Sequence, residues 1–151
     1  MFEKLIIDKI NQTLRVKQNI LKDNELIKNI DEIVKVIINA YKENKKVILF
    51  GNGGSAADAQ HLAGELVGKF YLERKALAAI ALTTNTSELT AIANDYNFNR
   101  VFARQVEALV NPGDIVIGIT TSGNSLNAIE GHQRSKATRS NCNWFYRGIW
   151  W

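Results

Sequence analysis

Three short apolar runs, each followed by a polar loop, constrain the fold of this chain more than any other feature. The first run is apolar on both faces, which is typical of a strand buried in a parallel sheet. The runs cover residues 47–50, 77–82 and 115–119, and the polar loops cover 51–55, 83–87 and 120–125. Strand, loop and helix in repetition predict an α/β fold with a parallel sheet, whose ligands bind at the carboxyl ends of the strands.

Helical periodicity separates the runs and also precedes them. Two amphipathic helices are expected at about 3–21 and 24–41, ahead of the first strand. Further helices are expected at 55–67, 88–94 and 99–110, the first of them directly after the first polar loop. The apolar faces of the N-terminal pair have three possible partners: each other, the sheet or another subunit.

Composition excludes several classes of protein. Hydrophobic residues make up 46% of the 151 residues, but no apolar run has the length of a membrane span. The single cysteine, Cys142, excludes an internal disulfide framework and a cysteine zinc cluster. The net charge of +4 is carried by the four basic residues after Glu130, where no acidic residue occurs. We therefore expect a cytoplasmic protein with neither a membrane nor a nucleic acid as partner.

The first polar loop, Gly51-Asn52-Gly53-Gly54-Ser55, is suited to an anion. Its glycines let the backbone approach a phosphate closely, and the amides of the following helix favour negative charge. Ala56 stands where a dinucleotide fingerprint has its third glycine, and the Gly-Lys-Ser/Thr of a P-loop is missing. The alternative is a tight turn in which Ser55 caps the helix and Asp58 completes a capping box.

The third polar loop carries four hydroxyls at the end of a buried strand, on Thr120, Thr121, Ser122 and Ser125. A sugar phosphate offers many acceptors, so neutral hydroxyls and backbone amides suit it. The alternative is ordinary capping by Ser125. Two such loops in one sheet favour a binding site.

His61 and Glu65 are four residues apart on the helix that follows the glycine loop, which puts them on one face. Imidazole and carboxylate can bind zinc or can act as base and acid. The alternative is a surface pair, because two ligands are too few for a metal site. Asn94 and Asp95 end another helix near the same edge, where the alternative is a C-cap.

Together these motifs resemble the sugar isomerase (SIS) domain family over residues 1–130, and within it the branch that isomerises heptose phosphates. The resemblance implies a three-layer fold with a parallel sheet flanked by helices and an N-terminal helical pair within residues 1–44. It implies zinc as cofactor, bound by His61 and Glu65, with Glu65 also as the catalytic base. It implies that the substrate contacts are Asn52, Gly53, Gly54, Ser55, Glu65, Asn94 and Asp95, and that Thr120, Thr121, Ser122 and Ser125 hold its phosphate.

The implied reaction interconverts sedoheptulose 7-phosphate and D-glycero-D-manno-heptose 7-phosphate through an enediol, in heptose biosynthesis for lipopolysaccharide or capsule. Relatives of this kind are homotetramers with shared active sites. Two alternatives remain: a non-catalytic SIS protein that binds the replication initiator, and a domain that senses a sugar phosphate. The resemblance implies that the initiator-binding kind lacks the metal-binding glutamate, so Glu65 favours the enzyme.

The chain departs from this resemblance after about residue 130. Relatives continue with more sheet and a long helix whose Gln and His complete the zinc site. Here residues 131–151 form an anomalous tail that holds all three tryptophans. Back-translated in another frame, residues 141–150 permit a strand and a Thr-Gly-Gly turn, so our hypothesis is a frameshift near Gly131. With the C-terminal part missing, the zinc site is incomplete and we expect an inactive or poorly folded chain.

Overall fold

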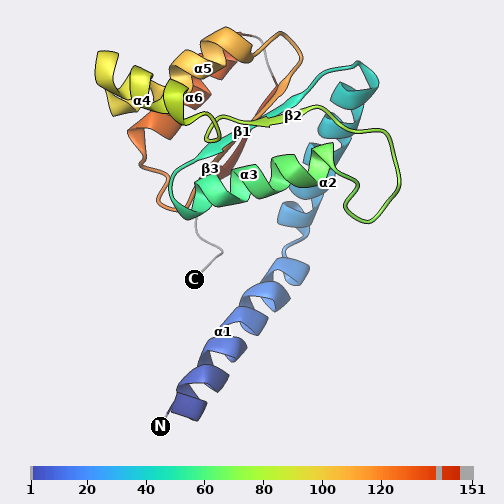
Figure 1. Ribbon diagram of the computed structural model, residues 1–151. Helices are drawn as coiled ribbons and strands as arrows, with labels where there is room; N and C mark the ends of the chain where they lie inside the picture. Colours follow the sequence, from blue (N-terminus) through green and yellow to red (C-terminus); the bar gives the residue numbers. More distant parts are fainter. Residues whose placement is uncertain (1, 139–140, 147–151) are drawn as a thin grey trace.

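Four parallel strands form a sheet between two layers of helices (Figure 1). The computed structural model describes residues 2–138 and the backbone of 141–146. The helices are α1 (Phe2–Lys22), α2 (Asn24–Lys42), α3 (Gly54–Val67), α4 (Thr86–Asp95), α5 (Val101–Leu109) and α6 (Leu126–Ala137), with a short 3₁₀ turn, η1 (Phe98–Arg100). The strands are β1 (Val47–Gly51), β2 (Ala79–Ala81), β3 (Ile115–Thr120) and β4 (Asn141–Tyr146). The predicted three-layer α/β architecture is confirmed.

The strand order is β2-β1-β3-β4, and all three neighbouring pairs are parallel. Leu49 of β1 is in register with Ala81 on one side and with Ile117 on the other. Gly51 is paired with Ile119, so β1 and β3 end side by side. The loops that leave these two strands are therefore neighbours.

Each face of β1 and β3 builds its own core. Ile48, Phe50 and Val116 point to the layer of α4, α5 and α6, where they pack with Phe102 and Val106. On the opposite face, residues of β1 and β3 pack against small residues of α3 and the last turns of α2; they are Val47, Leu49, Ile115 and Ile117. Strands buried on both faces explain why the predicted runs lack an alternating pattern.

Strand β2 is shorter than the predicted 77–82. The N–H of Leu77 donates to the carbonyl of Leu66 at the end of α3 (3.1 Å), so this residue pairs with a helix end and not with β1. β2 is also an edge strand of the sheet. An apolar run can thus extend past the strand ladder when one of its ends finds another acceptor.

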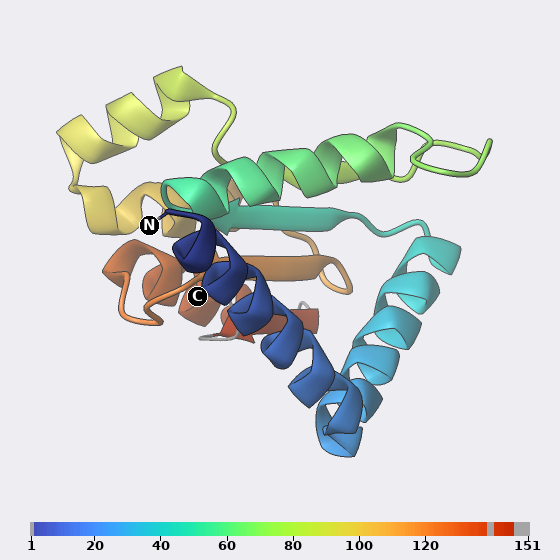
Figure 2. The same cartoon turned by 90° about the horizontal axis from the view of Figure 1, so that it is seen from below.

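Helix α1 and the first turns of α2 stand apart from the sheet, and of these two helices only the last turns of α2 contact it. Figure 1 shows α1 pointing away from the body of the molecule, and Figure 2 shows it meeting α2 at a V-shaped junction. No residue of α1 is buried, and Ala40 is the buried residue of α2. Large apolar side chains remain exposed along both helices, among them Leu5, Ile6, Ile10, Leu14, Ile30 and Val34. Neither the sheet nor the partner helix covers these faces within one chain.

A buried ion pair joins the amino ends of β1 and β3. Asp114 is 2% exposed and accepts from the backbone N–H of Lys46 (3.1 Å), from its ammonium (2.6 Å) and from the N–H of Asn111 (2.8 Å). Burial raises the pKa of the Asp114 carboxyl, but these hydrogen bonds and the Lys46 charge outweigh it, so the pKa lies below its ordinary value.

Helix α6 runs through the predicted boundary at residue 130, and Gly131 and His132 are buried within it. The backbone of Asn141–Tyr146 pairs with β3 as strand β4. Residues 139–140 and 147–151 of the predicted tail lie outside the described residues. The division of the chain at 130 and the frameshift hypothesis remain predictions. Among the described helices, none has the length and apolar character needed to cross a membrane.

Candidate active site

The glycine loop is pressed against the neighbouring strand. A Cβ on Gly51 would lie 2.7 Å from the carbonyl oxygen of Ile119 and 2.7 Å from the Cβ of Ser55. Such distances are not found for real Cβ atoms, so only glycine fits here without a shift of the backbone. The loop between β1 and α3 is thereby held beside the end of β3.

Helix α3 begins without a side-chain cap. Its N-cap is Gly53, with φ of 55°, and no side-chain hydrogen bond closes the first turn. The backbone closes it, through the N–H of Ser55 to the carbonyl of Asn52 (3.0 Å). The alternative of a Ser55 cap with Asp58 as its partner is therefore wrong, because Ser55 lies inside the helix and is buried. Gly53 and Gly54 are exposed at this helix end, where backbone amides favour an anion.

A reciprocal amide pair joins this loop to α6. Asn52 Nδ2 donates to Asn127 Oδ1 (2.8 Å), and Asn127 Nδ2 donates to Asn52 Oδ1 (2.9 Å). Asn127 is 3% exposed. Sequence analysis missed Asn127; its signal would have been an asparagine two residues past Ser125 at the start of a helix.

The hydroxyl loop after β3 uses some of its side chains to hold its own shape. Thr120 is buried, and its Oγ1 accepts from the N–H of Gly123 (3.1 Å). Ser122 Oγ accepts from the N–H of Asn124 (3.2 Å). Ser125 is the N-cap of α6 but makes no side-chain cap hydrogen bond, and Thr121 is exposed. The hydroxyls of Ser125 and Thr121 therefore remain for a ligand at the N-terminus of α6.

The loop after β2 joins the same edge. Gln60 on α3 donates to Thr83 Oγ1 (3.0 Å), which ties this loop to α3. Asn85 caps α4 by accepting from the N–H groups of Ser87 and Glu88. The helices α3, α4 and α6 thus all begin at the carboxyl edge of the sheet, which concentrates the positive ends of three helix dipoles there.

His61 and Glu65 face each other on the exposed side of α3. His61 Nε2 lies 3.6 Å from Glu65 Oε1, and the side chains are 74% and 36% exposed. At about 1.5 Å per residue, Glu65 lies roughly 16 Å along the helix from Gly54. Within one chain Glu65 therefore lies about three turns of α3 away from the glycine loop.

Arg74 holds the end of α3 on which Glu65 stands. Its guanidinium donates to the carbonyl oxygens of Glu65 and Leu66, both at 2.9 Å. A cation on the last carbonyls of a helix satisfies acceptors that have no intrahelical partner. No sequence pattern indicated this contact, because it depends on how the loop after α3 folds back.

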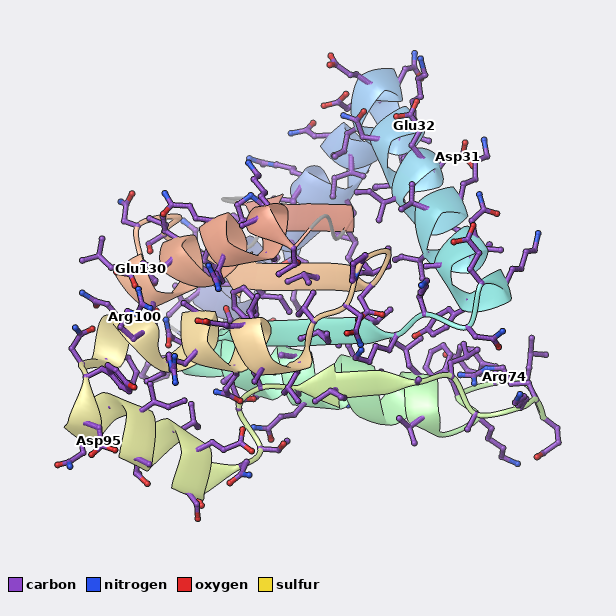
Figure 3. All side chains as sticks on the ribbon, turned by 90° about the horizontal axis from the view of Figure 1, so that it is seen from above. Asp31, Glu32, Arg74, Asp95, Arg100 and Glu130 are labelled. Carbon is purple, nitrogen blue, oxygen red and sulfur yellow. The ribbon has the colours of Figure 1, made fainter. Side chains whose placement is uncertain are left out.

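Asn94 and Asp95 lie in the last turn of α4, both exposed, with Asn94 Nδ2 donating to Asp95 Oδ1 (3.0 Å). The C-cap of this helix is Tyr96. Figure 3 shows Asp95 and Arg74 at opposite ends of the molecule. Because Arg74 contacts the carbonyl of Glu65, Glu65 lies far from Asp95 within one chain.

The donors at His61 and Glu65 suit zinc in kind but not in number. Two ligands of one tetrahedral zinc lie roughly 3.4 Å apart, close to the 3.6 Å found here. Among the described residues, however, no three His, Cys, Asp or Glu side chains come together as a metal site. This part of the chain therefore supplies two donors of a site that needs more.

Comparison with known proteins identifies the family. The SIS domain model matches residues 10–139. Phosphoheptose isomerase of Clostridium acetobutylicum is 55% identical over 127 residues, which cover 84% of this chain and 65% of that protein. The probable phosphoheptose isomerase of Thermoplasma acidophilum is 61% identical over 111 residues, which cover 72% of this chain and 61% of that protein. The chain thus spans less than two thirds of the length of these curated relatives.

Solved structures agree with the sequence relatives. Phosphoheptose isomerase from Neisseria gonorrhoeae superposes with a TM-score of 0.88 at 38% identity, covering 97% of this chain and 75% of its own. The enzyme from Francisella tularensis gives a TM-score of 0.92 at 32% identity, covering 98% and 76%. The fold, the motif-bearing loops and these relatives lead to one conclusion: the chain belongs to the SIS domain family.

Proposed function

We propose that this chain carries the sugar-phosphate site of a phosphoheptose isomerase, which interconverts sedoheptulose 7-phosphate and D-glycero-D-manno-heptose 7-phosphate in heptose biosynthesis. The observation that carries the proposal is the joining of the glycine loop and the hydroxyl loop at one edge of the sheet, through Asn52 and Asn127. The identity to named phosphoheptose isomerases supports it. These relatives do not favour the initiator-binding or sensing alternatives.

Each group of residues has a part in the proposed reaction. The loop of Thr120, Thr121, Ser122 and Ser125 holds the phosphate at the N-terminus of α6, where the helix dipole favours the anion. The hydroxyls of Thr121 and Ser125 donate to it, and Thr120 and Ser122 keep the loop in shape. Asn52, Gly53, Gly54, Ser55, Asn94 and Asp95 contact the sugar. The Glu65 carboxylate removes the C1 proton of the ketose, and the electron pair moves to form the 1,2-enediol as O2 is protonated. Return of the proton to C2, with loss of the O1 proton, gives the aldose.

His61 and Glu65 are proposed as two ligands of a zinc ion, supported by their chemistry and their separation. When bound, zinc would polarise the oxygens of the substrate. The other donors come from a second chain or from outside the described residues.

A homotetramer in the cytoplasm is the proposed assembly. Two observations support a site shared between chains: Glu65 and Asp95 are far apart within one chain, and the apolar faces of α1 and α2 are uncovered. A second copy packed on these helices buries the faces and brings a second set of site residues. The single cysteine suits a reducing compartment.

The test is binding and turnover of sedoheptulose 7-phosphate by the full chain with added zinc. We expect the phosphorylated sugar to bind at least tenfold more tightly than sedoheptulose, since the loops supply phosphate donors. Turnover is expected to be low with two zinc ligands, and Glu65→Gln should reduce it a further 100-fold or more. Glu73→Gln, an exposed carboxylate paired with Lys69, is the control. Equal binding of the two sugars would contradict the proposal.

A further inference from the structure

Asn127 is a buried polar residue that has no assigned role in the proposed reaction. It lies in the first turn of α6, just behind the hydroxyl loop, and is almost fully buried. A buried carboxamide is costly unless its donors and acceptors are paired. Its side chain is paired with the backbone N–H of Ala128 and with the side chain of Asn52.

The backbone decides how the Asn127 amide is oriented. The N–H of Ala128 donates to one of its two terminal atoms (2.9 Å), and that atom must be the oxygen. The other atom is then Nδ2, and it donates to Asn52. Asn52 must therefore present its oxygen to Nδ2 and its own nitrogen to the Asn127 oxygen. A flip of Asn52 would place donor against donor and acceptor against acceptor.

The hydrogen bonds to Asn127 engage half of the donors and acceptors of the Asn52 carboxamide. One Nδ2 proton and one Oδ1 lone pair of Asn52 are engaged by Asn127, so the second proton and the second lone pair remain. Asn52 is half-buried, and its own carbonyl is held by the N–H of Ser55. Both the backbone and the side chain of Asn52 are thus fixed before any ligand arrives.

We infer that Asn127 is a positioning residue: it fixes the Asn52 carboxamide so that the remaining N–H of Asn52 donates to an oxygen of the bound sugar phosphate. The inference rests on the proposed function. Because Asn127 belongs to the helix that follows the hydroxyl loop, the Asn52 donor and the phosphate donors are held at one spacing. A side chain that is already ordered in the free protein loses little conformational entropy on binding, so a preorganised site binds its ligand more tightly.

A double-mutant cycle tests this in the full chain, with sedoheptulose 7-phosphate as the probe and its Kd as the readout. Asn52→Ala and Asn127→Leu should each weaken binding about tenfold, the loss expected for one oriented hydrogen bond. The double variant should bind no more weakly than Asn52→Ala, because Asn127 acts through Asn52. Losses that multiply to about 100-fold, or an unchanged Kd in Asn127→Leu, would overturn the inference.

Gln105→Leu is the matched control. Gln105 is buried and donates to the carbonyl of Val101 within α5 (2.9 Å), so this variant also loses a buried amide, one whose hydrogen bond stays within α5. Its melting temperature should fall as that of Asn127→Leu does, while its Kd stays unchanged. A parallel change of Kd in both variants would show a structural role alone and overturn the inference.

A ligand-free measurement separates the inference from the proposed function. In the unmodified chain, the Asn127 side-chain amide protons should exchange slowly in ¹⁵N NMR, and Asn52→Ala should speed their exchange. Fast exchange in the unmodified chain contradicts the pair itself. Slow exchange without any binding of sedoheptulose 7-phosphate contradicts the proposed function and removes the inference with it.

Discussion

At the scale of single residues, the glycine loop shows how little room the candidate site leaves. Gly51→Ala should destabilise the protein by about 2 kcal/mol, because its Cβ would meet backbone oxygen and the Cβ of Ser55, and one of them must shift. The free energy of unfolding in urea measures this. Gly64→Ala is the control, since a Cβ there meets nothing within 4 Å and alanine favours the α3 helix by up to about 1 kcal/mol. Equal stability of the two variants would contradict the steric argument.

The residues of the site also show where sequence reasoning stops. The two loops and the His61–Glu65 face were predictable, because strand ends and helical spacing are local properties. Asn127 was not, because it acts on Asn52, 75 residues away along the chain. Arg74 was not, because its contact with the Glu65 carbonyl depends on how the loop after α3 folds back.

At the scale of elements, the Lys46–Asp114 pair joins the starts of β1 and β3. The folded pKa of Asp114 lies below its unfolded value, so its contribution to stability is present above the unfolded pKa and is lost as the pH falls through the folded one. We expect the free energy of unfolding to fall below about pH 4. In Asp114→Asn this part of the pH dependence should vanish, at a cost of about 2 kcal/mol near pH 7. Urea unfolding at a series of pH values measures the pH dependence and the loss of stability near pH 7. Asp31 forms an exposed ion pair with Lys35, and Asp31→Asn should change neither quantity.

Element boundaries followed from sequence where the pattern was local, and failed at β2, where a tertiary partner intervenes, and at α3, which no side chain caps. The long amphipathic pattern of α2 and the fully apolar β1 appear as expected. Strand β2 is shorter because Leu77 bonds to the end of α3, and α3 begins at a glycine because the backbone itself closes the turn. The Leu77 hydrogen bond cannot be read from neighbouring residues, whereas the one at α3 is local and leaves no capping side chain in the sequence to mark it.

At the scale of the whole molecule, the uncovered faces of α1 and α2 predict association. Ile10→Glu puts a charge on the apolar stripe of α1, where Ile10 is exposed within one chain. We expect this variant to lose the proposed tetramer, since a charge in an apolar interface is costly. Light scattering after size exclusion measures the mass. Gln12→Glu, on the same helix, should leave the mass unchanged, and a monomeric unmodified chain would contradict the assembly.

The isolation of α1 has a consequence for the chain in solution. A helix that buries no residue in its own chain has little to hold it except neighbouring copies, because most helical stability in proteins comes from packing of the apolar face. Under mass action, dilution should then unwind α1 while the sheet domain stays folded. The far-ultraviolet circular dichroism per residue of this protein would then depend on its concentration as well as on whether the sheet domain is folded.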